Sequence, residues 1–191
     1  LPEYRGAAPI NWAIINGDTR TGVTTFLLNH EIDKGAIIEQ TVVDILPEDN
    51  IGTLYDKLMM IGSELVIRTV DKIADGNYTT IEQMHIDEST LKPAPKIFKE
   101  DCRIAWESNG EDIINLIRGL SPYPAAWTPI YKDGVESGSM KIFSAHFVAG
   151  CKEQRPGTVI TDERNTLGVS VANGIVYIDE LQLGLARSGA R

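Results

Sequence analysis

The sequence predicts a chain in two halves, a partial α/β layer followed by a small all-β domain. Three observations carry this prediction. The first half alternates short apolar segments with one long amphipathic helix, the second half holds five short strand-like segments, and a polar stretch with two prolines separates the halves.

The first half begins with a short helix and two strands. Pro9 suits the first turn of a helix because it has no amide hydrogen to lose there, and residues 10–16 continue the helix up to Gly17. Residues 23–28 are β-branched or apolar nearly throughout, which predicts a strand buried on both faces. A turn over residues 30–35 leads to a second strand, expected over residues 36–45.

A long helix is expected over residues 51–75. Asn50 is its predicted N-terminal cap, and Gly76 stands where a glycine often ends a helix. Apolar residues recur every three or four positions. This stripe consists of Ile51, Leu54, Leu58, Ile61 and Leu65, widened by Val66, Val70 and Ile73. Two strands are too few to complete an α/β layer. We therefore expect the remaining strands of this layer to lie upstream of Leu1.

Residues 77–98 predict a linker. Most of this stretch is polar, and Pro93 and Pro95 favour an extended backbone. The sequence therefore divides into an α/β part over residues 1–76, the linker, and a second domain over residues 99–191.

The second domain opens on a helix and continues as short strands. Ser108 and Glu111 have the spacing of a capping box, and Pro122 ends the helical pattern. Five strands are expected over residues 127–132, 140–148, 157–161, 167–172 and 175–183, with a hairpin signal at Asn173-Gly174. The pattern fits a small barrel or a sandwich, and a barrel of the oligonucleotide-binding (OB) type is the favoured version.

Composition narrows the class of protein. The 191 residues are 42% hydrophobic and 24% charged, which is ordinary for a globular protein, and no apolar run is long enough to cross a bilayer. We expect a soluble, cytoplasmic monomer with no membrane partner. The net charge of −9 argues against a general nucleic-acid binder, although residues 97–191 carry only −2 of it and leave room for a local basic face. Cys102 and Cys151 are too isolated for a disulfide framework or a zinc site, so we expect free, partly buried thiols.

Candidate chemistry lies in the first 35 residues. Asp33 stands in an Asp-Lys-Gly turn, where its carboxylate could cap nearby amides, and a functional carboxylate is the alternative. His30, Glu31 and Asp33 do not form a known metal motif, so no metal is expected. Residues 5–9 are either a tight loop leading into the helix or a loop that lets a ligand approach the backbone. The three tryptophans are interpreted as core residues; they are Trp12, Trp106 and Trp127.

Several motifs occur in order along nearly the whole chain. They are Leu-Pro-x-Tyr-Arg-Gly-Ala-Ala-Pro-Ile at 1–10, Ala-Ile-x-x-Gly-Asp-x-x-Thr-Gly-Val-Thr at 13–24, Ile-Asp-x-Gly at 32–35, Gly-Thr-Leu-Tyr-Asp-Lys-Leu at 52–58, Ala-Pro-Lys-Ile at 94–97, Ile-Ala-Trp at 104–106 and Pro-Tyr-Pro-Ala-Ala-Trp at 122–127. In this set the chain resembles the methionyl-tRNA formyltransferase family. Two features depart from the family pattern: Ala105 replaces the usual Asp or Asn, and residues 184–191 do not continue the usual basic segment.

The resemblance implies a partial Rossmann-like formyltransferase domain followed by an OB-like barrel. It implies transfer of a formyl group from 10-formyltetrahydrofolate to the amino group of initiator methionyl-tRNA. Asp33 matches the family's catalytic aspartate, and Leu1 and Pro2 match the end of a loop in the folate site. Arg5, Lys96 and Lys99 are the candidate tRNA contacts. The alternatives are transfer to a sugar amine, action on formyltetrahydrofolate itself, or a tRNA-binding module without catalysis.

The family's other catalytic groups, an asparagine and a histidine, lie upstream of the motif that ends at Leu1-Pro2. Attack of the amine on the formyl carbon places negative charge on the formyl oxygen and positive charge on the nitrogen, so the site needs an oxyanion donor and a proton acceptor. Loss of one oxyanion donor costs on the order of a hundredfold in rate. We therefore expect a polypeptide that starts at Leu1 to be nearly inactive.

Overall fold

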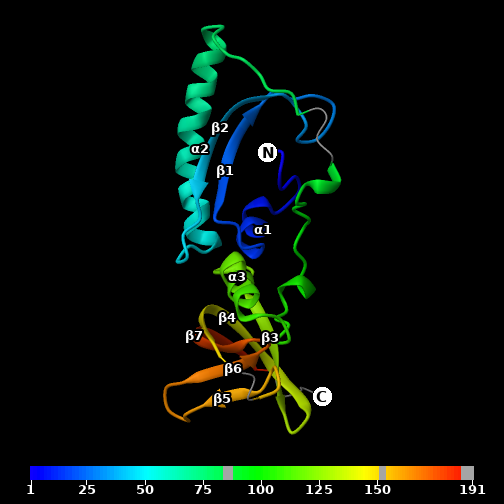
Figure 1. Ribbon diagram of the computed structural model, residues 1–191, viewed down its shortest axis with the longest axis vertical. Coiled ribbons are helices and arrows are strands. Elements are labelled where there is room, and N and C mark those ends of the chain that lie inside the picture. The colour runs from blue at the N-terminus through cyan, green and yellow to red at the C-terminus, as the bar shows by residue number, and fades with distance from the viewer. Residues whose placement is uncertain (84–87, 151–153, 186–191) are drawn as a thin grey trace. The chain divides into compact units, whose positions relative to one another are not determined.

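The structure is a computed structural model that describes residues 1–83, 88–150 and 154–185. The chain divides into two compact units, drawn in Figure 1. Unit 1 comprises residues 1–13 and 18–97, and unit 2 comprises residues 14–17 and those from Phe98 onward. None of the described helices is long and apolar enough to cross a membrane.

Unit 1 is built on a two-stranded antiparallel ribbon. After helix α1 (Pro9–Ile15), strand β1 (Arg20–Phe26) pairs with β2 (Ile37–Asp44), and helix α2 (Ile51–Ala74) runs alongside both strands in Figure 1. The prediction that the first strand is buried on both faces was wrong. No residue of β1 is fully buried: its residues are exposed or half-buried, although α2 packs against both strands of the ribbon.

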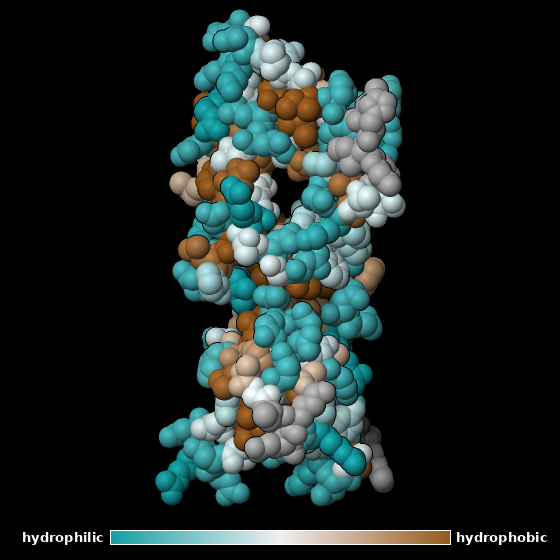
Figure 2. All heavy atoms as spheres, in the orientation of Figure 1, coloured by the Kyte–Doolittle hydropathy of each residue, from teal (hydrophilic) through white to brown (hydrophobic). Residues whose placement is uncertain are grey.

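Helix α2 carries the core of unit 1, and its predicted bounds agree with the structure to one residue. Leu54, Leu58 and Leu65 are buried. Thr69 is also buried and lies 2.9 Å from the Thr25 hydroxyl of β1. The predicted widening of the buried stripe was wrong, since its three members are 40–57% exposed; they are Val66, Val70 and Ile73. Brown apolar patches break the polar surface along α2 in Figure 2.

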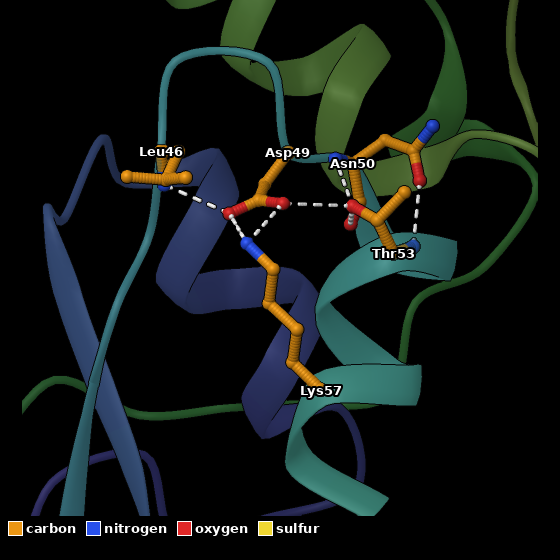
Figure 3. Close-up of polar contacts among 5 residues, drawn as sticks. All are labelled: Leu46, Asp49, Asn50, Thr53 and Lys57. Carbon is orange, nitrogen blue, oxygen red and sulfur yellow. Dashed lines mark hydrogen bonds and ion pairs between the residues drawn. The ribbon is translucent and has the colours of Figure 1, made fainter.

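The predicted cap of α2 is present in full. Asn50 Oδ1 accepts a hydrogen bond from the Thr53 amide, and Thr53 Oγ1 accepts one from the Asn50 amide, at 3.0 and 3.1 Å (Figure 3). Two of the first-turn donors that a helix leaves unsatisfied are thereby paired.

The predicted linker packs on unit 1. A short 3-10 helix, η1 (Glu88–Thr90), lies within it. Ile81 pairs with Ile37 beside β2, and Ala94 forms a bridge to Gly6. At Gly6, where φ is +143°, a Cβ would lie 2.1 Å from the Ala94 carbonyl oxygen. The close backbone approach that the loop at residues 5–9 permits is therefore made by the chain itself.

Unit 2 is one five-stranded antiparallel sheet with a helix against it. A short η2 (Glu100–Cys102) and helix α3 (Gly110–Leu120) precede the strands. The strands are β3 (Ala126–Lys132), β4 (Val135–Ala149), β5 (Val159–Thr161), β6 (Leu167–Val171) and β7 (Gly174–Leu185). Their order in the sheet is β3-β4-β7-β6-β5, with α3 packed on β4. All five predicted strands are present, and they form a single sheet rather than the two sheets of a sandwich.

The start of α3 differs from the prediction. Asn109, not Ser108, is the N-cap residue, and it makes no side-chain capping bond. Asn173, in the turn between β6 and β7, caps the helix instead: its Oδ1 accepts from the Gly110 amide and its Nδ2 donates to Glu111, both at 2.8 Å. This hydrogen bond from Asn173 holds the pKa of Glu111 below its usual value.

Cys102 is a free thiol, as predicted, but it is buried rather than partly buried, and this burial raises its pKa. Cys151 and the atypical terminal residues 186–191 lie outside the described residues. None of the three tryptophans is fully buried, and each indole N–H donates to an oxygen of its own unit; the acceptors are Pro95 O, Thr128 Oγ1 and Lys99 O.

Candidate functional site

Asp33 lies in the predicted turn between β1 and β2, and the structure gives that turn another cap. The Asn29 side chain accepts from the Glu31 amide at 2.8 Å and donates to the Lys34 carbonyl at 3.3 Å. Asp33 itself is half-buried and has φ of +58°, a left-handed conformation that few non-glycine residues adopt. The Asn29 side chain therefore caps this turn, which is the role that the turn interpretation gave to the Asp33 carboxylate.

Leu1 and Asp33, 32 positions apart in the sequence, line one pocket of about 610 Å³. Gln40 of β2 fixes the Leu1 side of this pocket by donating to the Leu1 carbonyl at 2.6 Å. The remaining wall combines apolar side chains, which include Ile10, Val23, Val42 and Leu58, with polar and charged ones, which include Glu3, Asp18 and Arg20. Pro2 does not line this pocket but lines a smaller one of about 130 Å³ together with Arg5. The structure therefore brings together two of the three residues predicted for the active site.

A polar cluster on the same wall was not predicted. Tyr4 Oη and Lys92 Nζ both donate to the Asp18 carboxylate, each at 2.5 Å. The hydrogen bond from Lys92 to Asp18 raises the pKa of Lys92 above its ordinary value. Tyr4 and Asp18 belong to the motifs noted in the sequence, but Lys92 is distant along the chain, so only the fold reveals the cluster.

The three candidate tRNA contacts have different surroundings. Arg5 points inward, and its Nη2 donates to Gln83 Oε1 at 2.9 Å. Lys96 is exposed in unit 1. Lys99 is exposed in unit 2, with its Nζ 5.3 Å from the centre of the Trp127 ring. The Arg103 guanidinium lies 6.0 Å from the same ring, so two cations flank one indole.

A larger pocket of about 800 Å³ lies in unit 2, with Trp106, Thr128, Tyr131 and Met140 among its lining residues. It holds none of the predicted site residues. We assign the candidate site to the 610 Å³ pocket of unit 1 because it brings Leu1 and Asp33 together, whereas the unit 2 pocket is lined by neither.

Two family models match the sequence. The model described as "Formyl transferase" matches residues 1–70, and the model described as "Formyl transferase, C-terminal domain" matches residues 96–188. The chain belongs to the formyltransferase family. The first match lies mainly in unit 1, and the second lies mainly in unit 2.

Curated relatives of this formyltransferase chain carry the name methionyl-tRNA formyltransferase. The chain is 48% identical over 184 residues to the protein from Bacteroides fragilis, covering 96% of this chain and 57% of that protein. It is 46% identical over 184 residues to the protein from Flavobacterium johnsoniae, with the same coverage of 96% and 57%. The chain thus spans 57% of the length of these relatives.

Several solved structures share the fold. An N-formyltransferase from Helicobacter canadensis, bound to folinic acid and dTDP-3-aminofucose, gives a TM-score of 0.70 at 20% identity, covering 95% of this chain and 63% of that one. HypX from Aquifex aeolicus in complex with tetrahydrofolic acid gives 0.67 at 20%, covering 95% and 30%. Methionyl-tRNA formyltransferase from Clostridium thermocellum gives 0.57 at 15%, covering 97% and 66%. At these identities the comparisons establish the fold alone.

Proposed function

We propose that the protein containing this chain transfers a formyl group from 10-formyltetrahydrofolate to the amino group of methionyl-initiator-tRNA. One observation carries the proposal: the 48% identity to a methionyl-tRNA formyltransferase extends over 96% of the chain. The sugar-amine enzyme and HypX share the fold at 20% identity, which is a much weaker argument for their substrates.

The unit 1 pocket suits a folate cosubstrate in the chemistry of its walls. Its apolar side chains can pack against a flat ring, and the Asp33 and Asp18 carboxylates can accept hydrogen bonds from ring and amino N–H groups. We assign Leu1 and Asp33 to this site; Pro2, which lines the separate 130 Å³ pocket, is assigned the role of shaping the Leu1 loop. The bound cosubstrate supplies the formyl carbon that the amine attacks.

Asp33 is proposed to act on the amine nitrogen, which becomes positively charged during the reaction. The attacking amine becomes positively charged, and a carboxylate at the pocket wall stabilises that charge and takes part in removing the proton. By resemblance, Asp33 also orients the family histidine, and that histidine and an asparagine stabilise the formyl oxygen. Those two residues belong upstream of the Leu-Pro motif, so this chain supplies one of the three groups.

Unit 2 supplies the RNA-binding surface in this proposal. Its five-stranded antiparallel sheet fits an OB-type barrel, a fold that binds oligonucleotides. Lys99 and Arg103 can neutralise phosphates while Trp127 offers an aromatic face beside them. Lys96 is a second exposed candidate, whereas Arg5 is proposed to act mainly within unit 1, through Gln83.

The test is an acceptor comparison with the polypeptide encoded by the complete gene. The purified protein and 10-formyltetrahydrofolate are mixed with methionyl-initiator-tRNA, with a dTDP-aminosugar, or with neither, and formylated products are measured. We expect formylmethionyl-tRNA as the main product. Turnover with the aminosugar alone would favour the second candidate, and loss of formyl donor without any acceptor would favour a hydrolase.

A further inference from the structure

The turn that carries Asp33 is held by a residue 50 positions later in the chain. Gln83 lies in the predicted linker, and its side chain is buried, with the residue 7% exposed. Its Nε2 donates to the Asp33 carbonyl at 3.1 Å and to the Gly35 carbonyl at 2.6 Å. Its Oε1 accepts from Arg5 Nη2 at 2.9 Å. One amide therefore connects the Asp33 turn to the loop that begins at Leu1-Pro2.

The chemistry of this contact fits an amide and no other uncharged side chain. An amide group offers two N–H donors on one end and a carbonyl acceptor on the other, and all three partners are of the matching kind. A carboxylate could accept from Arg5 but has no hydrogen for two backbone carbonyls. A buried polar group with all its partners in place holds its surroundings in one arrangement.

The turn needs such a support because its backbone is unusual. Asp33 has φ of +58°, a conformation that L residues hold at an energetic cost unless neighbouring contacts fix it. Gly35 sits so close to Leu27 that a Cβ would lie 1.5 Å from the Leu27 carbonyl oxygen. Gln83 donates a hydrogen bond to the backbone carbonyl of Asp33 and another to that of Gly35.

We propose that Gln83 is a positioning residue for Asp33, fixing its carboxylate relative to the Leu1-Pro2 loop through the shared contact with Arg5. The proposal rests on the proposed function for the role of Asp33 and adds a residue to it. Gln83 is not among the residues that line the pocket; it acts by keeping the carboxylate in place. A displacement of about 1 Å at a reacting group can cost on the order of a hundredfold in rate.

The anchoring can be tested without any activity measurement, in the full-length protein. Amide hydrogen exchange over residues 29–36 is compared between wild type, Gln83→Leu and the control Gln182→Leu, which changes an exposed glutamine in β7. We expect faster exchange over residues 29–36 in Gln83→Leu alone, with the amides of α2 unchanged. Unchanged exchange over residues 29–36 in Gln83→Leu overturns the anchoring, and so does equal acceleration throughout unit 1.

The positioning role is tested by kinetics in the full-length protein. Gln83→Leu and Gln83→Glu are both expected to lower kcat roughly a hundredfold with little change in KM for the donor or the tRNA. The Glu variant keeps the volume and an acceptor for Arg5 but loses both donors, so it separates hydrogen bonding from packing. Wild-type kcat in the Glu variant, or a change confined to KM, overturns the positioning role. A wild-type protein without transferase activity refutes the proposed function, and the positioning role with it, whereas the exchange result on the anchoring stands by itself.

Discussion

Replacement of Asp49 by alanine is expected to destabilise unit 1 without touching its pocket. Asp49 precedes the cap of α2 and is only 3% exposed. Its carboxylate accepts from Lys57 Nζ at 2.6 and 2.7 Å, from the Leu46 amide at 2.8 Å and from Thr53 Oγ1 at 3.0 Å (Figure 3). The Asp49 side chain thereby connects the loop that follows β2 to the first two turns of α2.

The expected loss is about 3 kcal/mol in the free energy of unfolding. The Leu46 amide and the Thr53 hydroxyl each lose an acceptor, at about 1 kcal/mol apiece. The Lys57 side chain is 37% exposed, so water screens its pairing, and we assign about 1 kcal/mol to that contact as well. Asp56→Ala on the same helix is the control, since Asp56 is exposed and should change stability by less than about 0.5 kcal/mol.

The stability difference between wild type and Asp49→Ala should decrease at low pH. Burial alone would raise the pKa of Asp49, but Lys57, the Leu46 amide and Thr53 together hold it below its ordinary value of 3.8. Because the folded pKa lies below the unfolded one, the stabilisation is complete above about pH 4 and is lost as the pH falls through the folded value. The difference between wild type and Asp49→Ala should therefore shrink below pH 4.

Hydrogen exchange of the α2 amides measures the free energy of unfolding of unit 1. The measurement is valid even if the two units unfold in separate transitions. An Asp49→Ala loss no larger than that of Asp56→Ala would show that the carboxylate cluster adds nothing to stability. A difference that grows as the pH falls below 4 would contradict the assigned direction of the pKa shift.

Three further predictions concern the site and unit 2. In the full-length protein, Asp33→Asn should lower kcat about a hundredfold or more while the melting temperature stays near that of wild type; activity that merely follows the folded fraction would restore the turn interpretation. Asn173→Ala should destabilise unit 2 by about 1 kcal/mol in urea unfolding followed by tryptophan fluorescence, because α3 loses its cap, whereas Asn165→Ala in an exposed turn should cost less. Lys99→Ala should weaken tRNA binding and reduce the slope of log K against log salt by about 1, a change that Lys132→Ala should not produce; equal slopes would remove Lys99 from the interface.

The sequence by itself determined many local features of this protein, although not the N-cap of α3. Asn50 and the apolar repeat behind it placed α2 to within one residue, and turn residues separated all five strands of unit 2. These features depend on side chains a few positions apart, whose spacing along a helix or strand is fixed by backbone geometry. The turn at Asp33 was visible for the same reason.

Only the tertiary structure decided which distant side chains meet. Asn173 caps a helix that begins 63 positions earlier, and Gln83 reaches back 50 positions to hold the Asp33 turn. The placement of Leu1 and Asp33 in one pocket, with Pro2 outside it, also follows from the packing of unit 1. No local periodicity encodes such contacts, because they arise from loop closure and packing rather than from the spacing of neighbours.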